Sequence, residues 1–141
     1  MISITFRITL LHPPRGVVFR LQRGRSELIA PSFESAGSVS FEFTLRVASD
    51  EAGRPPRLLG PFAQGPPNAR FVYVNSGKQA GQAESCWDRR AKVPLRDISV
   101  SLIAHAAASD AVIETQISGT AGDGGPACAT VPLIGGWRIA S

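Results

Sequence analysis

Hydrophobic and polar residues alternate along the first part of the chain. From Ile2 to Leu10 every second residue is apolar, and the residues between them are Ser3, Thr5, Arg7 and Thr9. A period of two is typical of a β-strand that buries one face. The same pattern returns from Val17 to Leu21 and, most clearly, from Val39 to Val47. It predicts three half-buried strands before residue 48.

Shorter apolar segments predict further strands in the middle of the chain. Leu28 and Ile29 fit a short edge segment. The segment from Arg70 to Asn75 is apolar on both faces, which indicates a central strand. Ala91 to Leu95 alternates again, although Pro94 restricts it to a sheet edge or to the end of a strand.

The last third of the chain predicts a hairpin and a final strand. Val112 to Ser118 and Ala127 to Val131 flank the turn-rich segment from Gly119 to Pro126. Two such segments around a turn favour a β-hairpin with a long loop. Trp137 to Ala140 predicts a last short strand.

One segment, from Ile98 to Ser109, fits either a strand or a helix. Its first residues alternate as a strand would, but Ile98, Leu102, Ile103 and Ala106 also share one face of a helix. The alanine-rich second half favours a helix, and Asp97 is a plausible N-cap. We predict a helix near residues 98–109 and keep the strand as the alternative.

About seven short strands with one helix predict a mostly-β (α+β) fold, either an antiparallel β-sandwich or a partly closed barrel. The length of 141 residues fits a single domain over residues 1–141. Hydrophobic residues make up 43% and charged residues 18%, which is a globular composition. No stretch approaches the ~20 apolar residues of a membrane span, and no export signal precedes the first strand. We therefore expect a cytoplasmic protein.

The charge and the reactive residues restrict which partners and cofactors are expected, but they do not identify a function. The net charge is +4, and all but two of the 15 basic residues are arginine. That excess permits an anionic partner but does not require nucleic acid. Cys86 and Cys128 are expected to be free thiols. Together with the separate His12 and His105 they offer no metal-ligand spacing, so we predict no metal and no cofactor.

The segment from Gly60 to Leu95 concentrates unusual residues. It contains Gly60-Pro61-Phe62-Ala63-Gln64-Gly65, then Arg70-Phe71-Val72-Tyr73, then Trp87 followed by Arg89-Arg90-Ala91-Lys92-Val93-Pro94-Leu95. In these motifs the chain resembles a bacterial family of small domains of unknown function with the signature GPF-x-QG, RF-x-Y and RRAK-x-x-L. The resemblance implies a fold with an alanine-rich helix and carries no chemistry.

Seven side chains of this segment form the candidate ligand site. Arginine and lysine donate to carboxylate or phosphate, glutamine and tyrosine add neutral hydrogen bonds, and tryptophan offers a flat apolar surface. The candidates are Gln64, Arg70, Tyr73, Trp87, Arg89, Arg90 and Lys92. The alternative is structural. In a regular strand Arg90 and Lys92 face water, and Arg89 faces the other way, where it could pair with Glu84 or Glu42.

Three functions fit these observations. The first is a non-enzymatic module that binds a small anionic or planar ligand. The second is a protein–protein or homodimerisation module. Such a module associates through an edge strand or a sheet face, and Ile2 to Leu10 or Trp137 to Ala140 are the candidate segments. The third is a weak nucleic-acid binder, which no RNA-binding motif supports. An enzyme is the less favoured class. His12 follows a strand and His105 lies in an apolar, alanine-rich segment, so neither marks a nucleophile–base pair, and the acidic residues are dispersed rather than paired.

Overall fold

The structure is a computed structural model that describes residues 2–13, 17–23, 27–29, 33–35, 37–47, 71–77, 88–95, 97–119 and 129–140. These residues form ten strands and one helix. The strands are β1 (Ile2–Leu11), β2 (Val18–Arg23), β3 (Glu27–Ile29), β4 (Phe33–Ser35), β5 (Ser38–Val47), β6 (Phe71–Gly77), β7 (Asp88–Pro94), β8 (Ile113–Ser118), β9 (Ala129–Thr130) and β10 (Ile134–Ile139). The helix is α2 (Val100–Ser109).

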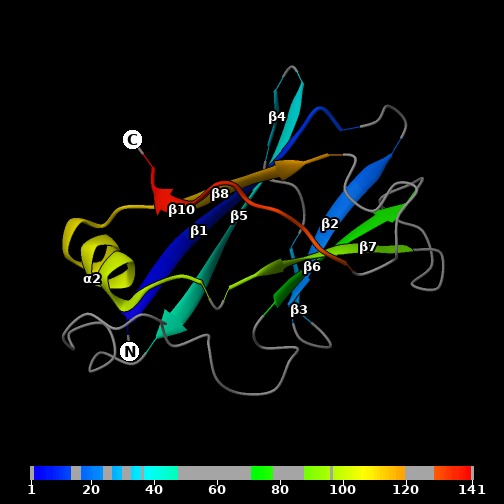
Figure 1. The fold of residues 1–141 in the computed structure, drawn as a ribbon. Coiled ribbons are helices and arrows are strands. Elements are labelled where there is room, and N and C mark those ends of the chain that lie inside the picture. The colour runs from blue at the N-terminus through cyan, green and yellow to red at the C-terminus, as the bar shows by residue number, and fades with distance from the viewer. Residues whose placement is uncertain are drawn as a thin grey trace.

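The strands form two five-stranded sheets, which confirms the predicted mostly-β class with one helix. Sheet 1 has the order β10-β8-β1-β5-β4, and sheet 2 has the order β3-β2-β6-β7-β9. Most neighbours are antiparallel, but each sheet contains one parallel pair, β1 with β8 and β7 with β9. In Figure 1 α2 lies beside sheet 1, at the opposite side of the view from β2, β6 and β7. The sheets are therefore mixed, where the sequence predicted only antiparallel pairing.

One hydrophobic core joins both sheets and the helix. The alternating apolar residues of β1 and β5 supply its centre, with Phe6 and Phe41 at 0% exposure. Leu21 and Val72 contribute from sheet 2, and Ile103 contributes from α2. Burial follows the alternation read from the sequence, because each strand turns every second side chain toward the same core.

Two predictions about the arrangement of the strands are wrong. β8 and β9 do not form a hairpin: β8 lies between β1 and β10 in sheet 1, whereas β9 pairs with β7 in sheet 2. The connection between Ser118 and Ala129 therefore crosses from one sheet to the other. The first strand cannot serve as an edge for dimerisation either, because β1 is hydrogen-bonded on both sides as the central strand of sheet 1. β10 does lie at the edge of the described sheet.

The helix begins later than the sequence suggested. Asp97 is not its N-cap, because the chain first makes a turn in which the Ile98 backbone N–H donates to the Leu95 carbonyl (3.1 Å). Ser99 then takes an extended conformation, and its hydroxyl accepts a hydrogen bond from the Leu102 N–H (3.2 Å). The turn places Ile98 in the core before the helix starts. No helix in the described part of the chain has the length and apolar character of a membrane span.

Replacing Ser99 with alanine is expected to lower the free energy of unfolding by about 1 kcal/mol, because the Leu102 N–H loses its acceptor at the helix N-terminus. Urea titration followed by far-ultraviolet circular dichroism measures this change. The matched control is Ser101→Ala, an exposed position inside the helix, where alanine is expected to be neutral or slightly stabilising. Equal losses in both variants would contradict the assignment of Ser99 as the cap.

Trp137 connects the two sheets at the edge of the molecule. The pairing of β10 with β8 is irregular between Ile134 and Arg138, and both Gly135 and Gly136 have positive φ. This irregular segment places the Trp137 ring edge-on to Phe6 of β1, with centroids 6.1 Å apart. Its indole N–H donates to the Pro94 carbonyl at the end of β7 (3.0 Å). The edge strand of sheet 1 is thereby attached to sheet 2.

Candidate functional site

The outer face of sheet 2 is the face turned away from the core. Val72 and Val74 of β6 and Ala91 of β7 are core residues. The residues that alternate with them lie on the other face of the sheet. The described side chains of this outer face include Arg20, Gln22, Phe71, Tyr73, Asn75 and Lys92. None of the side chains described there is acidic.

A row of side chains crosses four strands of this face. Strand register aligns Tyr73 of β6 with Gln22 of β2 on one side and with Lys92 of β7 on the other, and Lys92 with Thr130 of β9. The Lys92 ammonium lies over the Phe71 ring, 4.6 Å from its centroid. An aromatic face attracts a cation electrostatically and holds it in place. The row therefore presents a positioned cation beside a tyrosine.

Two amide side chains on this face are buried. Gln22 is 8% and Asn75 3% exposed, so both are nearly as enclosed as the core. The Asn75 amide donates from Nδ2 to Gln22 Oε1 (3.1 Å). Its own Oδ1 is buried and accepts no hydrogen bond from the described residues. A buried acceptor without a donor costs about 1–3 kcal/mol, so such a group is normally satisfied by water or a ligand.

The structure brings two of the seven predicted site residues together as cross-strand neighbours. Tyr73 and Lys92 are direct cross-strand partners, and both side chains are half-buried. Arg89 and Arg90 lie in β7, the strand of Lys92, and Arg89 pairs with Asn75 of β6. Gln64, Arg70 and Trp87 lie outside the described residues.

The strand that carries the cationic residues is not regular. Val74 pairs with Ala91, but the next residue of β6, Asn75, pairs with Arg89. The register skips Arg90, which is the extra residue of a β-bulge. The prediction that Arg89 faces opposite to Arg90 and Lys92 was conditional on a regular strand, and the bulge removes that condition. The suggested partner Glu42 lies in sheet 1, where it binds Arg7.

Sequence reasoning missed two residues of β2 that lie on this face, Arg20 and Gln22. Arg20 lies opposite Asn75 in the register of β2 and β6 and is half-buried, and Gln22 lies two residues further along β2. Their positions in the alternation did mark them as residues that face away from the core. Nothing in the sequence pattern indicated that β2 lies beside β6, because that pairing joins residues about 50 to 60 positions apart.

The histidines contribute nothing to this face. His12 and His105 are both exposed, the first in the turn after β1 and the second in α2. Within the described part of the chain no three histidine, cysteine or acidic side chains come close enough to hold a metal ion. Cys86 and Cys128 lie outside the described residues.

These features define a mostly-β protein of two mixed sheets and one helix, with a cationic and aromatic outer face on sheet 2. The chain belongs to a family of unknown function (DUF5990), whose model matches residues 4–140. The match confirms the predicted membership of a family of unknown function and spans both sheets. Comparison with curated proteins gave no match. Comparison with solved structures gave none either.

Proposed function

We propose that this protein binds a small anionic ligand, with a planar group, on the outer face of sheet 2. The observation that carries the proposal is the pairing of Tyr73 with Lys92, whose ammonium lies over Phe71. Arg20 adds a second half-buried cation on the same face. Lysine and arginine are suited to carboxylate or phosphate, and the aromatic rings are suited to the face of a planar group.

The buried amides support the same proposal. A polar pair at 8% and 3% exposure is unusual on the outer face of a sheet, where side chains are ordinarily solvated. The Asn75 and Gln22 amides offer neutral hydrogen bonds next to the cations. A few polar groups placed beside apolar and aromatic side chains are the usual composition of a ligand site. Arg89, Arg90, Arg70, Gln64 and Trp87 are proposed as further ligand contacts.

The proposal is tested by titrating isotope-labelled protein with benzoate and, separately, with inorganic phosphate, and following backbone amide signals by NMR. We expect benzoate to shift the amides of β6 and β7 around Tyr73 and Lys92. Lys92→Gln is expected to weaken this binding by about tenfold or more, since it removes a charge-assisted contact worth ~1.5–3 kcal/mol. Arg20→Gln is expected to act in the same direction.

The matched control for this experiment is Arg46→Gln. Arg46 is exposed on β5 of sheet 1, so its loss changes the net charge by the same amount without touching sheet 2. It is expected to leave benzoate binding unchanged. Absence of localised shifts with both probes, or equal weakening by Lys92→Gln and Arg46→Gln, would refute a site on this face.

Other predictions from the sequence belong to the same proposal. We propose that the chain is a single domain, that it is cytoplasmic and that it is of bacterial origin. The core shared by both sheets and the helix supports the first of these, the single domain. The three-part signature between Gly60 and Leu95 stays a prediction. Nucleic-acid binding is the weaker alternative. It predicts an affinity for nucleic acid that falls steeply as the salt concentration rises.

A further inference from the structure

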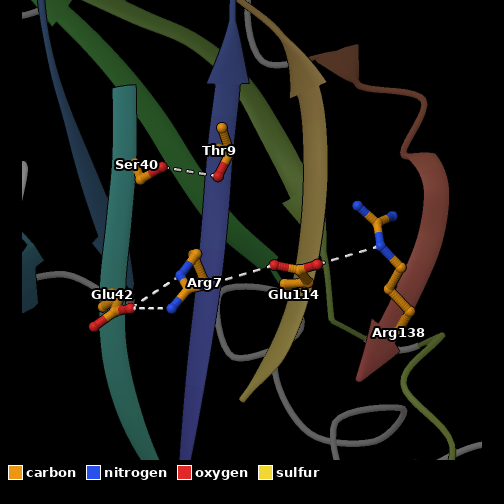
Figure 2. A network of polar contacts seen from close by, with 6 residues as sticks. All are labelled: Arg7, Thr9, Ser40, Glu42, Glu114 and Arg138. Carbon is orange, nitrogen blue, oxygen red and sulfur yellow. Dashed lines mark hydrogen bonds and ion pairs between the residues drawn. The ribbon is translucent and has the colours of Figure 1, made fainter. Parts of the chain in front are cut away.

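The outer face of sheet 1 carries a row of alternating charges. Strand register aligns Glu42, Arg7, Glu114 and Arg138 across β5, β1, β8 and β10. Arg7 contacts Glu42 through Nη2 (2.6 Å) and Nε (2.9 Å), and it reaches Glu114 through Nη1 (3.4 Å). Arg138 Nε contacts the other oxygen of Glu114 (3.4 Å). Figure 2 shows the resulting order of negative, positive, negative and positive across the sheet.

Each side chain of this row is partly exposed. The side chains of Arg7 and Glu42 are 32% and 31% exposed, and those of Glu114 and Arg138 are 21% and 36% exposed. The neighbouring row runs from Ser40 through Thr9 and Gln116 to Ile134, with Thr9 Oγ1 2.9 Å from Ser40 Oγ. Ile134, at 46% exposure, is the one large hydrophobic residue exposed in the described part of the chain.

The order of these charges is complementary to itself. Two copies of the chain can place the outer faces of their sheets 1 together. The two-fold axis that relates them then lies between the two faces, parallel to the strands and between β1 and β8. The rotation places Glu42 of one copy against the partner's Arg138, and Arg7 against the partner's Glu114. In the next row it places Thr9 against the partner's Gln116, a hydroxyl against an amide, and Ser40 against the partner's exposed Ile134. Every charge of the row meets its opposite, as an isologous interface requires.

We propose that a second copy of this chain docks on the outer face of sheet 1 through this row. We choose a second copy as the partner because the row of charges is complementary to the same row in a copy rotated by 180°. The dimer is weak and salt-dependent, since pairs between exposed side chains each contribute little and are screened by ions. The proposal is independent of ligand binding on sheet 2.

The test exchanges charges without altering composition or net charge. In E42R/R7E the row becomes positive, negative, negative, positive, so the same rotation sets like charges against each other. In E42R/R7E/E114R/R138E all four are exchanged, and the row is again complementary to itself. Sedimentation velocity over a range of protein concentration measures association of each variant and of the unmodified chain, and circular dichroism melting confirms that each is folded.

We expect the dissociation constant of the unmodified dimer to rise about tenfold or more when the salt concentration rises from about 0.1 M to about 1 M. The Debye length falls from about 10 Å to about 3 Å over this range, so the ion pairs are screened. The half exchange is expected to be monomeric and the full exchange to dimerise again. E114R/R138E, also palindromic in charge, replaces the first half exchange if that variant does not fold. A monomeric unmodified chain in the low-salt buffer, or dimers in the half exchange equal to those of the unmodified chain, would overturn the proposal.

Discussion

Replacing Phe6 with alanine is expected to lower the free energy of unfolding by about 3–5 kcal/mol, a large share of the stability of a domain of this size. Phe6 is 0% exposed in the central strand of sheet 1. Its ring stacks on Phe43 of β5, with centroids 5.6 Å apart, and receives Trp137 edge-on from β10. Alanine removes the ring that three strands share and leaves a cavity that the surrounding backbone cannot close.

Urea titration followed by circular dichroism gives the stability of this variant. Phe6→Leu retains part of the volume and keeps the measurement possible if the alanine variant does not fold, and its loss is expected to be smaller. Ile134→Ala is the control, measured in high salt, where the proposed dimer dissociates. Ile134 is 46% exposed, and its truncation is expected to change stability by no more than about 0.5 kcal/mol. Similar losses for Phe6→Ala and Ile134→Ala would show that Phe6 is not at the centre of the core.

Replacing Gly119 with alanine is expected to cost about 3 kcal/mol of stability. A Cβ on Gly119 would lie 2.6 Å from the backbone nitrogen and Cα of Pro13 and 2.7 Å from the Leu11 carbonyl oxygen. These are backbone atoms and cannot move aside as the end of a side chain does. The Gly119 N–H also donates to that Leu11 carbonyl (2.6 Å), so displacement of the chain breaks a hydrogen bond as well.

Gly136→Ala separates this steric effect from the cost of losing glycine. Gly136 has φ +64° and nothing within 4 Å of a built Cβ, so alanine there adds only conformational strain of about 1 kcal/mol. Gly119 has no such φ and is expected to lose more. A calorimetric comparison of the two melting temperatures decides the point, and a smaller loss at Gly119 than at Gly136 would contradict the close approach of β8 to the turn after β1.

The family match does not indicate what the protein binds. It places the chain in a family whose description assigns no activity. The two outer faces of the sheets are chemically distinct: sheet 1 carries charges paired within the row, and sheet 2 carries cations beside aromatic rings and buried amides. Ligand binding is therefore proposed for sheet 2, and self-association for sheet 1.

Much of the fold was predictable because it depends on local periodicity. The alternation in β1 and β5 identified the strands and also which side chains face the core, since the period of two links both properties. The helix near residues 98–109 was predicted from its alanine-rich second half, and Pro94 was correctly expected at the end of a strand. The errors were of another kind: the cap at Asp97, the hairpin of β8 with β9, and β1 as an edge.

The candidate site was predicted only in part, for the same reason. The sequence by itself determined the strand segments, the faces of the sheets and the Tyr73 and Lys92 candidates in the motif-rich segment. Only the tertiary structure decided that Tyr73 pairs with Lys92, that a bulge interrupts β7 at Arg90, and that Arg20 joins the face. Periodicity states which side of a strand a residue occupies. It does not state which strand lies next to it, because pairing is chosen by the packing of segments far apart in the chain.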